Sequence, residues 1–247
     1  MLSVIAAVFP CPAVSSLFLD FRDNYMNEII IWGASGHAKV LYEFCGKLGY
    51  KLVALFDNNH DIASPVAGVP LYYAKDGFVR WMADRGNTKV RCLVAIGGER
   101  GRDRFEIQRY LQSQGVPAAT VVHPAAFVAE SAILGEGSQI LAGAVVGAEA
   151  RLGSSCIVNT AASVDHECHI EDGVHMAPGV TLAGCVRVGR FSFLGVGATV
   201  LPRIKIGTDC IIGAGSLVTR DIPDGVVAYG NPARIVRKSS QDRNAVI

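Results

Sequence analysis

The feature that most constrains the fold is an aliphatic residue at every sixth position over much of the carboxyl half of the chain. The series is Leu134, Ile140, Val146, Leu152, Val158, Val164, Ile170, Met176, Leu182, Val188, Leu194, Val200, Ile206, Ile212 and Val218. A six-residue period fits neither an α-helix nor long alternating strands, but it fits short strands joined by tight corners. The pattern therefore predicts a parallel β-helix of triangular section, in which three repeats form one coil.

A second set of residues, four positions after the first, is small or branched. It includes Ser138, Ala144, Ala150, Cys156, Ala162, Cys168, Ile204, Cys210, Ser216 and Ile222. We expect the first set to stack inside the prism and the second set to fill its narrow corners. Glycine often follows the first set directly, as at Gly135, Gly147 and Gly153. We expect glycine there because it adopts backbone angles that other residues resist.

The rest of the chain divides around this repeat. The 247 residues, half of them hydrophobic, suffice for two domains with substantial cores. We expect the β-helix over residues 121–238, an α/β domain over residues 27–120 and a tail at residues 239–247. Residues 1–26 fit neither pattern, because Pro10 and Pro12 break an apolar stretch that no basic residue precedes. We interpret this segment as a loose tail or an upstream-start artefact.

Charge and cysteine usage narrow the function classes. The 23 basic and 22 acidic residues nearly balance, so nothing in the charge favours nucleic acid or an anionic membrane as a partner. The seven cysteines form no C-x-x-C pair, and Cys156, Cys168 and Cys210 occupy the small slot of the repeat. Buried thiols of this kind favour a reducing, cytoplasmic compartment over a disulfide framework.

Strand and helix patterns alternate in residues 27–120. Residues 29–32 read as a buried strand, 38–48 as a helix and 52–57 as the next strand. Helices are expected at 78–85 and 102–114, with a strand at 92–96 between them. This order predicts a small parallel sheet with right-handed crossovers. Such a Rossmann-like unit is a half-sized relative of the doubly wound nucleotide folds.

The segment Gly33-Ala34-Ser35-Gly36-His37 joins the first strand to the first helix. Unpaired amides and the positive end of the helix dipole suit a phosphate or pyrophosphate there. Asp57, at the end of the second strand, lies where a carboxylate accepts a hydrogen bond from a ribose or base. Because the turn lacks the full G-x-G-x-x-G pattern, a purely structural turn, with Asp57 as a helix cap, is the alternative. NAD is not expected, since the unit is too short for a second mononucleotide half.

Polar residues concentrate at one place in the repeat. The register leaves Asp165, His166 and Glu167 outside, near a corner. A histidine beside a carboxylate can act as a general base, because the carboxylate fixes the tautomer and stabilises the imidazolium. A solvated surface histidine is the alternative, but the nearby His175 favours chemistry.

Several segments together resemble a known family. They are Val164-Asp165-His166-Glu167-Cys168, His175-Met176-Ala177-Pro178-Gly179, Leu182-Ala183-Gly184 and Gly230-Asn231-Pro232-Ala233, and Gly33-Ala34-Ser35-Gly36-His37 also fits. They are similar to segments of the bacterial sugar acetyltransferases that join a nucleotide-binding domain to a left-handed β-helix of hexapeptide repeats. That group includes the N-acetyltransferases of UDP-4-amino-4,6-dideoxy sugars and the sialic acid O-acetyltransferases. The left hand of the helix is implied by this resemblance.

The resemblance implies direct acetyl transfer from acetyl-CoA to an amino group of a nucleotide-linked sugar, with no metal. His166 would be the base, Glu167 its support, and Asn159 would position the acceptor. The acetyl-CoA contacts would be His175, Gly184, Val196 and Ala214, with the Gly184 amide facing the thioester oxygen. The contacts to the nucleotide sugar would be Gly33, Ser35, Gly36, His37, Asp57, Ala95, Ile96 and Gly97.

The two histidines are nine residues apart, which is half of an eighteen-residue coil. Within one chain we expect them at different corners, separated by roughly 13 Å. They would share a site only between subunits, so we predict a homotrimer with active sites in its clefts.

Other functions remain open. A metal-dependent β-helix hydratase would use His166, His169 and His175, although their spacing does not place all three on one corner. A scaffold would use the repeat for assembly alone and has no need of the histidine corner. A sialic acid hydroxyl is a further candidate acceptor, because a histidine base serves an amine and a hydroxyl equally. An amino acid acceptor fits the nucleotide unit less well.

Overall fold

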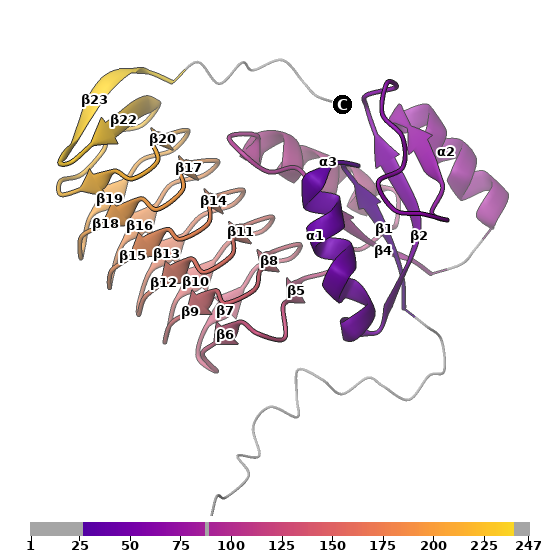
Figure 1. Cartoon of the computed structure of the whole chain (residues 1–247), viewed down its shortest axis with the longest axis horizontal. Coiled ribbons are helices and arrows are strands. Elements are labelled where there is room, and N and C mark those ends of the chain that lie inside the picture. Colours follow the sequence, from indigo (N-terminus) through magenta and orange to yellow (C-terminus); the bar gives the residue numbers. More distant parts are fainter. Residues whose placement is uncertain (1–26, 87–88, 240–247) are drawn as a thin grey trace, which may run out of the picture.

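The computed structural model describes residues 27–86 and 89–239, which form an α/β domain followed by a β-helix (Figure 1). The interpretation of residues 1–26, and of the tail from residue 240 onward, lies outside the described residues. Both expected domains are present in the expected order.

The α/β domain contains a four-stranded parallel sheet in the order β3-β2-β1-β4. Its elements are β1 (Asn27–Trp32), α1 (Gly36–Cys45), the 3₁₀ turn η2 (Gly46–Leu48), β2 (Tyr50–Asp57), β3 (Leu71–Tyr73), α2 (Ala74–Arg85), β4 (Arg91–Val94) and α3 (Gly101–Ser113). The expected strands and helices are confirmed within a few residues. Strand β3 was not predicted from the sequence, because a half-buried edge strand of three residues is too short to show an alternating hydrophobic pattern.

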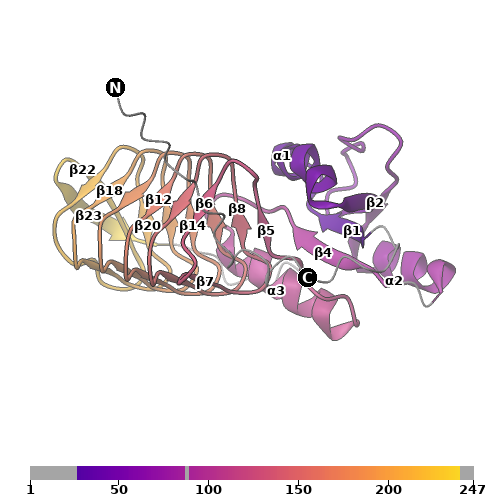
Figure 2. The same cartoon turned by 90° about the horizontal axis from the view of Figure 1, so that it is seen from below.

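The isoleucines of β1 are buried on both faces of the sheet. Ile29 and Ile31 pack in one cluster with residues of α1, whereas Ile30 and Trp32 pack in another with residues of α2 and α3. Figure 2 shows α1 on one side of the sheet and the other two helices on the opposite side. A parallel strand covered on both faces needs a continuous apolar run, which explains why the run does not alternate.

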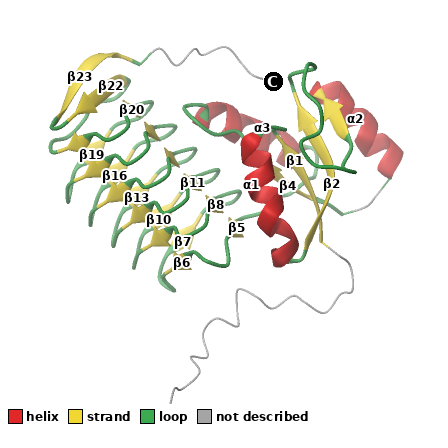
Figure 3. Ribbon diagram, viewed as in Figure 1, coloured by secondary structure: helices red, strands yellow, loops and turns green. Residues whose placement is uncertain are grey.

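The β-helix is built from strands of two residues each, stacked in three parallel sheets (Figure 3). They are β5 (Val121–Val122), β6 (Phe127–Val128), β7 (Ile133–Leu134), β8 (Gln139–Ile140), β9 (Val145–Val146), β10 (Arg151–Leu152), β11 (Ile157–Val158), β12 (Ser163–Val164), β13 (His169–Ile170), β14 (His175–Met176), β15 (Thr181–Leu182), β16 (Arg187–Val188), β17 (Phe193–Leu194), β18 (Thr199–Val200), β19 (Lys205–Ile206), β20 (Ile211–Ile212) and β21 (Leu217–Val218). Every aliphatic residue of the hexad from Ile140 to Val218 is at most 4% exposed, which confirms the predicted core.

The three sheets differ in the side chains that point outward. The domain-facing sheet (β5, β8, β11, β14, β17 and β20) presents Val121, Gln139, Ile157, His175, Phe193 and Ile211. The uncharged sheet (β6, β9, β12, β15, β18 and β21) presents Phe127, Val145, Ser163, Thr181, Thr199 and Leu217. The basic sheet (β7, β10, β13, β16 and β19) presents Ile133, Arg151, His169, Arg187 and Lys205. Inward and outward residues alternate along each strand, so each outward set forms a column.

The expected reason for the glycines after the inward residues was wrong. Gly135 and Gly147 do not have a positive φ; a Cβ there would lie 2.3 Å from the Gly153 carbonyl carbon and 2.9 Å from the Asp165 carbonyl carbon. The close approach of the next coil therefore excludes a side chain. The left-handed conformation falls two residues later, and Glu167 adopts it with a φ of 57°.

Helix α3 of the α/β domain packs along one edge of the β-helix and joins the two domains. Arg104 is 0% exposed, and its guanidinium donates hydrogen bonds to the carbonyl oxygens of Ile96 (2.7 Å), Ser155 (2.8 Å) and Gly173 (2.7 Å). One helical turn rises about 5.4 Å, close to the strand spacing of about 4.8 Å, so side chains on one helix face meet successive coils. Arg102, on the same helix, pairs with Asp209, farther along the edge, at 2.8 Å. Burial lowers the pKa of Arg104 to about 10.

An antiparallel hairpin of β22 (Val226–Gly230) and β23 (Ala233–Lys238) continues the domain-facing sheet beyond β20. The segment Gly230-Asn231-Pro232-Ala233 makes its turn. No helix among the described residues has the length and apolar character needed to cross a membrane.

Candidate active site

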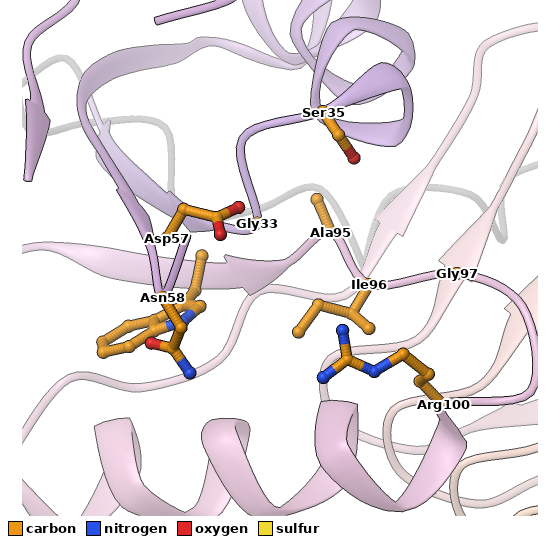
Figure 4. Close-up of a pocket in the computed structure, with 9 residues that line it drawn as sticks. Gly33, Ser35, Asp57, Asn58, Ala95, Ile96, Gly97 and Arg100 are labelled. Atoms are coloured by element: carbon orange, nitrogen blue, oxygen red, sulfur yellow. The ribbon is translucent and has the colours of Figure 1, made fainter. Parts of the chain in front are cut away.

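A cleft of about 260 Å³ opens at the carboxyl ends of β1, β2 and β4 (Figure 4). It is lined by Trp32, Gly33, Ser35, Asp57, Asn58, Ala95, Ile96, Gly97 and Arg100. Six of these residues were expected from the sequence as contacts to a nucleotide sugar. The carboxyl edge of a parallel α/β sheet is where such folds bind their ligands.

The floor of the cleft admits no side chain at Gly33. Its φ is 104°, and a Cβ would lie 2.6 Å from the carbonyl oxygen of Ala95. The neighbouring Asp57 carboxylate accepts hydrogen bonds from the backbone amides of Ala34 (2.7 Å) and Asn59 (2.9 Å). Asp57 therefore holds the glycine turn in shape and also lines the cleft, so part of its role is structural. At the start of α1 the backbone amides of Gly36 and His37 have no acceptor among the described residues and suit an anion, whereas those of Ala38 and Lys39 donate to the carbonyl oxygen of Ser35.

The sequence reading missed Trp32, Asn58 and Arg100. Arg100 comes from the loop after β4, and its Nε lies 2.6 Å from Asp103 Oδ2. Arg100 could have been predicted from its position just after Gly97-Gly98, because that loop lies opposite the glycine turn that suits an anion.

His37 lies between the domains rather than in the cleft lining. Its Nε2 is 2.7 Å from Oε1 of Gln139, whose amide nitrogen donates to the carbonyl of Val94 at 2.8 Å. Since that donation turns Oε1 toward the histidine, His37 Nε2 carries a hydrogen. Burial is the main cause of a lowered His37 pKa, so the ring is neutral. Gln139 was not foreseen, because only the docked α/β domain buries it.

His175 lies on β14 of the domain-facing sheet, so the expectation that it occupies a corner was wrong. Its Nδ1 is 3.2 Å from the carbonyl oxygen of Gly98, which leaves Nε2 to accept from the Asn159 amide at 3.1 Å. Burial, with a smaller contribution from the charge of Arg104, lowers the pKa of His175 to about 3. A neutral, doubly bonded imidazole orients groups here and is unsuited to accept a proton.

We expect His175 to make the protein sensitive to acid. Its folded pKa of about 3 lies below the ordinary value of 6.5, so between these pH values the unfolded state binds a proton that the folded state does not. Stability is therefore lost as pH falls below 6.5, by about 1.4 kcal/mol per unit for one such group. Denaturant unfolding at pH 7 and pH 5 measures this slope. His175→Asn should reduce this slope, the remainder including the contribution of buried His37, and exposed His60→Gln should not change it; equal slopes in all three proteins would contradict the assignment.

His166 and Glu167 occupy the corner between the uncharged and basic sheets, and both side chains are more than half exposed. His166 Nδ1 lies 2.9 Å from Glu167 Oε2. The carboxylate thus fixes the Nδ1–H tautomer and leaves Nε2 as an open proton acceptor. The hydrogen bond from His166 is the main cause of the lowered Glu167 pKa, so the carboxylate stays ionised.

The imidazole of His166 rests on Gly184 of the next coil. A Cβ on Gly184 would lie 2.3 Å from His166 Nε2. Gly184→Ala should therefore turn the ring away and lower kcat by about 10- to 100-fold, as small misplacements of a catalytic group do. Gly46→Ala is the matched control, since nothing lies within 4 Å of that Cβ. A Gly184→Ala enzyme with the wild-type kcat would show that the ring is not seated in this way.

The structure thus gathers the expected residues at three places. The cleft is lined by most of the residues expected to contact a nucleotide sugar, and His175, which is hydrogen-bonded to Asn159, contacts Gly98 next to the lining residue Gly97. Asn159, Val196 and Ala214 lie at corners along the edge between the domain-facing and uncharged sheets. His166 and Gly184 lie at the next edge. His169 points outward from the basic sheet, so the three histidines of the hydratase alternative occupy different faces and do not meet.

These features are typical of a hexapeptide-repeat transferase with a fused α/β domain, and two family models agree. The PglD N-terminal domain model matches residues 28–107, and the bacterial transferase hexapeptide model of six repeats matches residues 185–220.

Solved structures resemble most of the chain. PerB from Caulobacter crescentus, in complex with CoA and GDP-perosamine, is 38% identical with a TM-score of 0.78, covering 86% of this chain and 98% of that one. The acetyltransferase domain of PglB from Neisseria gonorrhoeae, in complex with acetyl coenzyme A, is 33% identical with a TM-score of 0.75, covering 85% and 99%.

Curated relatives match over a shorter stretch. Galactoside O-acetyltransferase of Lactococcus lactis is 59% identical over 46 residues, which are 19% of this chain and 22% of that protein. A putative acetyltransferase of Staphylococcus aureus is 45% identical over 60 residues, which are 24% of this chain and 30% of that protein. The structural similarity, which covers 86% of this chain and 98% of PerB, shows the family: the chain belongs to the sugar acetyltransferases of the hexapeptide-repeat superfamily, whose β-helix is left-handed and whose members are acyltransferases.

Proposed function

We propose that the protein transfers an acetyl group from acetyl-CoA to the amino group of a nucleotide-linked amino sugar, with His166 as the general base. The observation that carries this proposal is the His166–Glu167 pair, because its open Nε2 belongs to an exposed imidazole oriented by a carboxylate. PerB, similar over its whole length, was solved with CoA and a nucleotide amino sugar. A cytoplasmic location fits both substrates.

The nucleotide would occupy the cleft of the α/β domain. The turn at Gly33 and the start of α1 suit the pyrophosphate, Arg100 supplies a positive charge, and Asp57 and Asn58 suit the ribose or base. Gly97 lines this cleft, and the next residue, Gly98, accepts a hydrogen bond from His175. A sugar leaving the cleft would thus pass along His175 and Asn159 toward the edge of the prism.

The chemical step needs no acyl-enzyme. The amine nitrogen attacks the thioester carbonyl and His166 Nε2 takes the amine proton. The tetrahedral intermediate then collapses by breaking its C–S bond, and the leaving CoA thiolate receives that proton from His166. Within the described residues the Gly184 N–H has no hydrogen-bond acceptor, which supports its role as donor to the developing oxyanion. Cys168 is unsuited to act as a nucleophile, since burial raises the pKa of its thiol to about 11.

We further propose that the active form is a homotrimer assembled on the uncharged sheet. That sheet presents no charged side chain, unlike the basic sheet, and it separates the edge with His166 from the edge with Asn159, Val196 and Ala214. Threefold packing on this sheet would bring His166 of one copy to the Asn159 edge of the next. Acetyl-CoA would lie in the cleft between them.

Thr181→Arg tests this assembly, because it places a charge at the centre of the uncharged sheet. We expect light scattering to show a trimer for the wild type and a monomer for the variant, with loss of nearly all activity. His169→Arg, an exposed outward position on the basic sheet, should leave both unchanged. A monomeric wild type, or an active monomeric variant, would contradict shared sites.

A substrate screen tests the activity itself. UDP- and GDP-linked amino sugars, free sialic acid and simple galactosides are incubated with acetyl-CoA, and release of CoA is measured with His166→Asn as blank. We expect turnover with a nucleotide amino sugar. Turnover only with the hydroxyl acceptors would replace the proposal by O-acetylation, for which the L. lactis similarity is the precedent.

A further inference from the structure

Cys185 stands beside the His166–Glu167 pair, and neither the family assignment nor the proposed chemistry gives it a role. It occupies the place in the next coil that Glu167 occupies in its own, and both residues are left-handed, with φ of 62° and 57°. Its amide donates to the carbonyl oxygen of His166 at 2.9 Å. Its Sγ lies 3.7 Å from Glu167 Oε2. The β-helix backbone therefore fixes a thiol, a carboxylate and an imidazole on one exposed corner.

These three groups form a donor set for a metal ion. One ligand atom from each of His166, Glu167 and Cys185 lies within 4.8 Å of the other two. Tetrahedral zinc with bonds of about 2.0 to 2.3 Å places its ligands roughly 3.3 to 3.8 Å apart, so small side-chain rotations suffice. Imidazole, carboxylate and thiolate together favour Zn²⁺ over the hard cations Mg²⁺ and Ca²⁺. The exposed position leaves the fourth coordination site to water.

We propose that this corner binds Zn²⁺ through His166 Nδ1, a Glu167 oxygen and Cys185 Sγ, and that the bound ion switches the enzyme off. The ion would therefore be an inhibitor and not a cofactor, because it occupies the imidazole that must accept the proton of the acceptor amine. The inhibitory part rests on the proposed function, whereas the binding part does not.

The protons account for the inhibition. Before binding, His166 carries its hydrogen on Nδ1, where Glu167 accepts it, and Nε2 holds a lone pair. Zinc takes the Nδ1 lone pair, so the single hydrogen of the neutral ring moves to Nε2. The thiol of Cys185 loses its proton to solvent, which gives one proton released per ion bound. With Nε2 protonated, the imidazole no longer accepts a proton from the acceptor amine.

Binding is tested directly by titrating Zn²⁺ into the full-length, tag-free, chelator-washed protein. We expect one ion per subunit, with a Kd of micromolar order and one proton released, as seen in buffers of different ionisation enthalpy. Cys185→Ser should weaken binding at least about tenfold, whereas His169→Gln should not change it. Co²⁺ should give a thiolate charge-transfer band that Cys185→Ser abolishes. Equal zinc affinity in Cys185→Ser and wild type, or no binding by wild type at 100 times the expected Kd, would overturn the proposal.

Inhibition is tested separately, once a substrate is known. Micromolar zinc should suppress acetyl transfer by the wild type, and a chelator should restore it. The rate of Cys185→Ser should be the same with and without micromolar zinc. Binding without inhibition would overturn the inhibitory part alone. If no sugar is acetylated at all, the proposed function fails, and the titration still decides whether the site exists.

Discussion

His166→Asn should lower kcat by about 10²- to 10⁴-fold, the usual contribution of a positioned general base. Asparagine keeps a polar side chain of similar reach at the corner but offers no proton acceptor of comparable basicity. Because Nε2 is assigned to the transition state and not to ground-state binding, KM for both substrates should change by less than about threefold. Steady-state kinetics with the acceptor found in the screen measures both effects.

The matched control is His169→Asn, three residues farther on, where the imidazole points outward from the basic sheet. We expect its kcat to equal that of the wild type. A His166→Asn enzyme with more than about a tenth of the wild-type kcat would refute the assignment of the base, whatever the substrate. Loss of activity in both variants would point instead to a disturbed β-helix, which circular dichroism would reveal.

Arg104→Met should cost about 3 to 5 kcal/mol of stability, the largest effect we expect from one side chain outside the β-helix. Methionine replaces the aliphatic stem but removes every donor. The carbonyl oxygens of Ile96, Ser155 and Gly173 then lose their partners inside the protein, at about 1 to 3 kcal/mol for each unsatisfied group. Denaturant unfolding measures the change, and separate transitions for the two domains are expected, because this residue couples them.

Arg102→Met is the comparison, since it removes a guanidinium from the same helix and the same edge. Its ion pair with Asp209 is about a third exposed on both sides, so we expect a loss of less than about 1 kcal/mol. Similar losses in the two variants would contradict the view that the buried carbonyl contacts, rather than charge alone, join the domains.

The sequence alone determined the β-helix, because each six-residue repeat meets the same surroundings. An inward residue such as Val164 contacts equivalents eighteen positions away, so the local pattern reports the tertiary contact directly. The same register placed His166 and Glu167 outside, and the alternation of strand and helix placed the cleft at Gly33 and Asp57. These features depend on periodicity and on short-range turns, which a sequence displays.

Only the tertiary structure decided how the two domains meet. Gln139 and His175 lie at outward repeat positions, which would be exposed to solvent in an isolated β-helix. The docked α/β domain buries them, and burial keeps the interface residues His37 and His175 neutral. In the sequence Arg104 looks like an ordinary arginine of a surface helix, although its buried guanidinium forms the hydrogen bonds that join the two domains. Cys185 reads as a turn residue until the coils are stacked and its thiol reaches Glu167. Contacts between two segments that do not belong to one sequence repeat produce no recognisable local sequence pattern, because they form only when the separate surfaces dock.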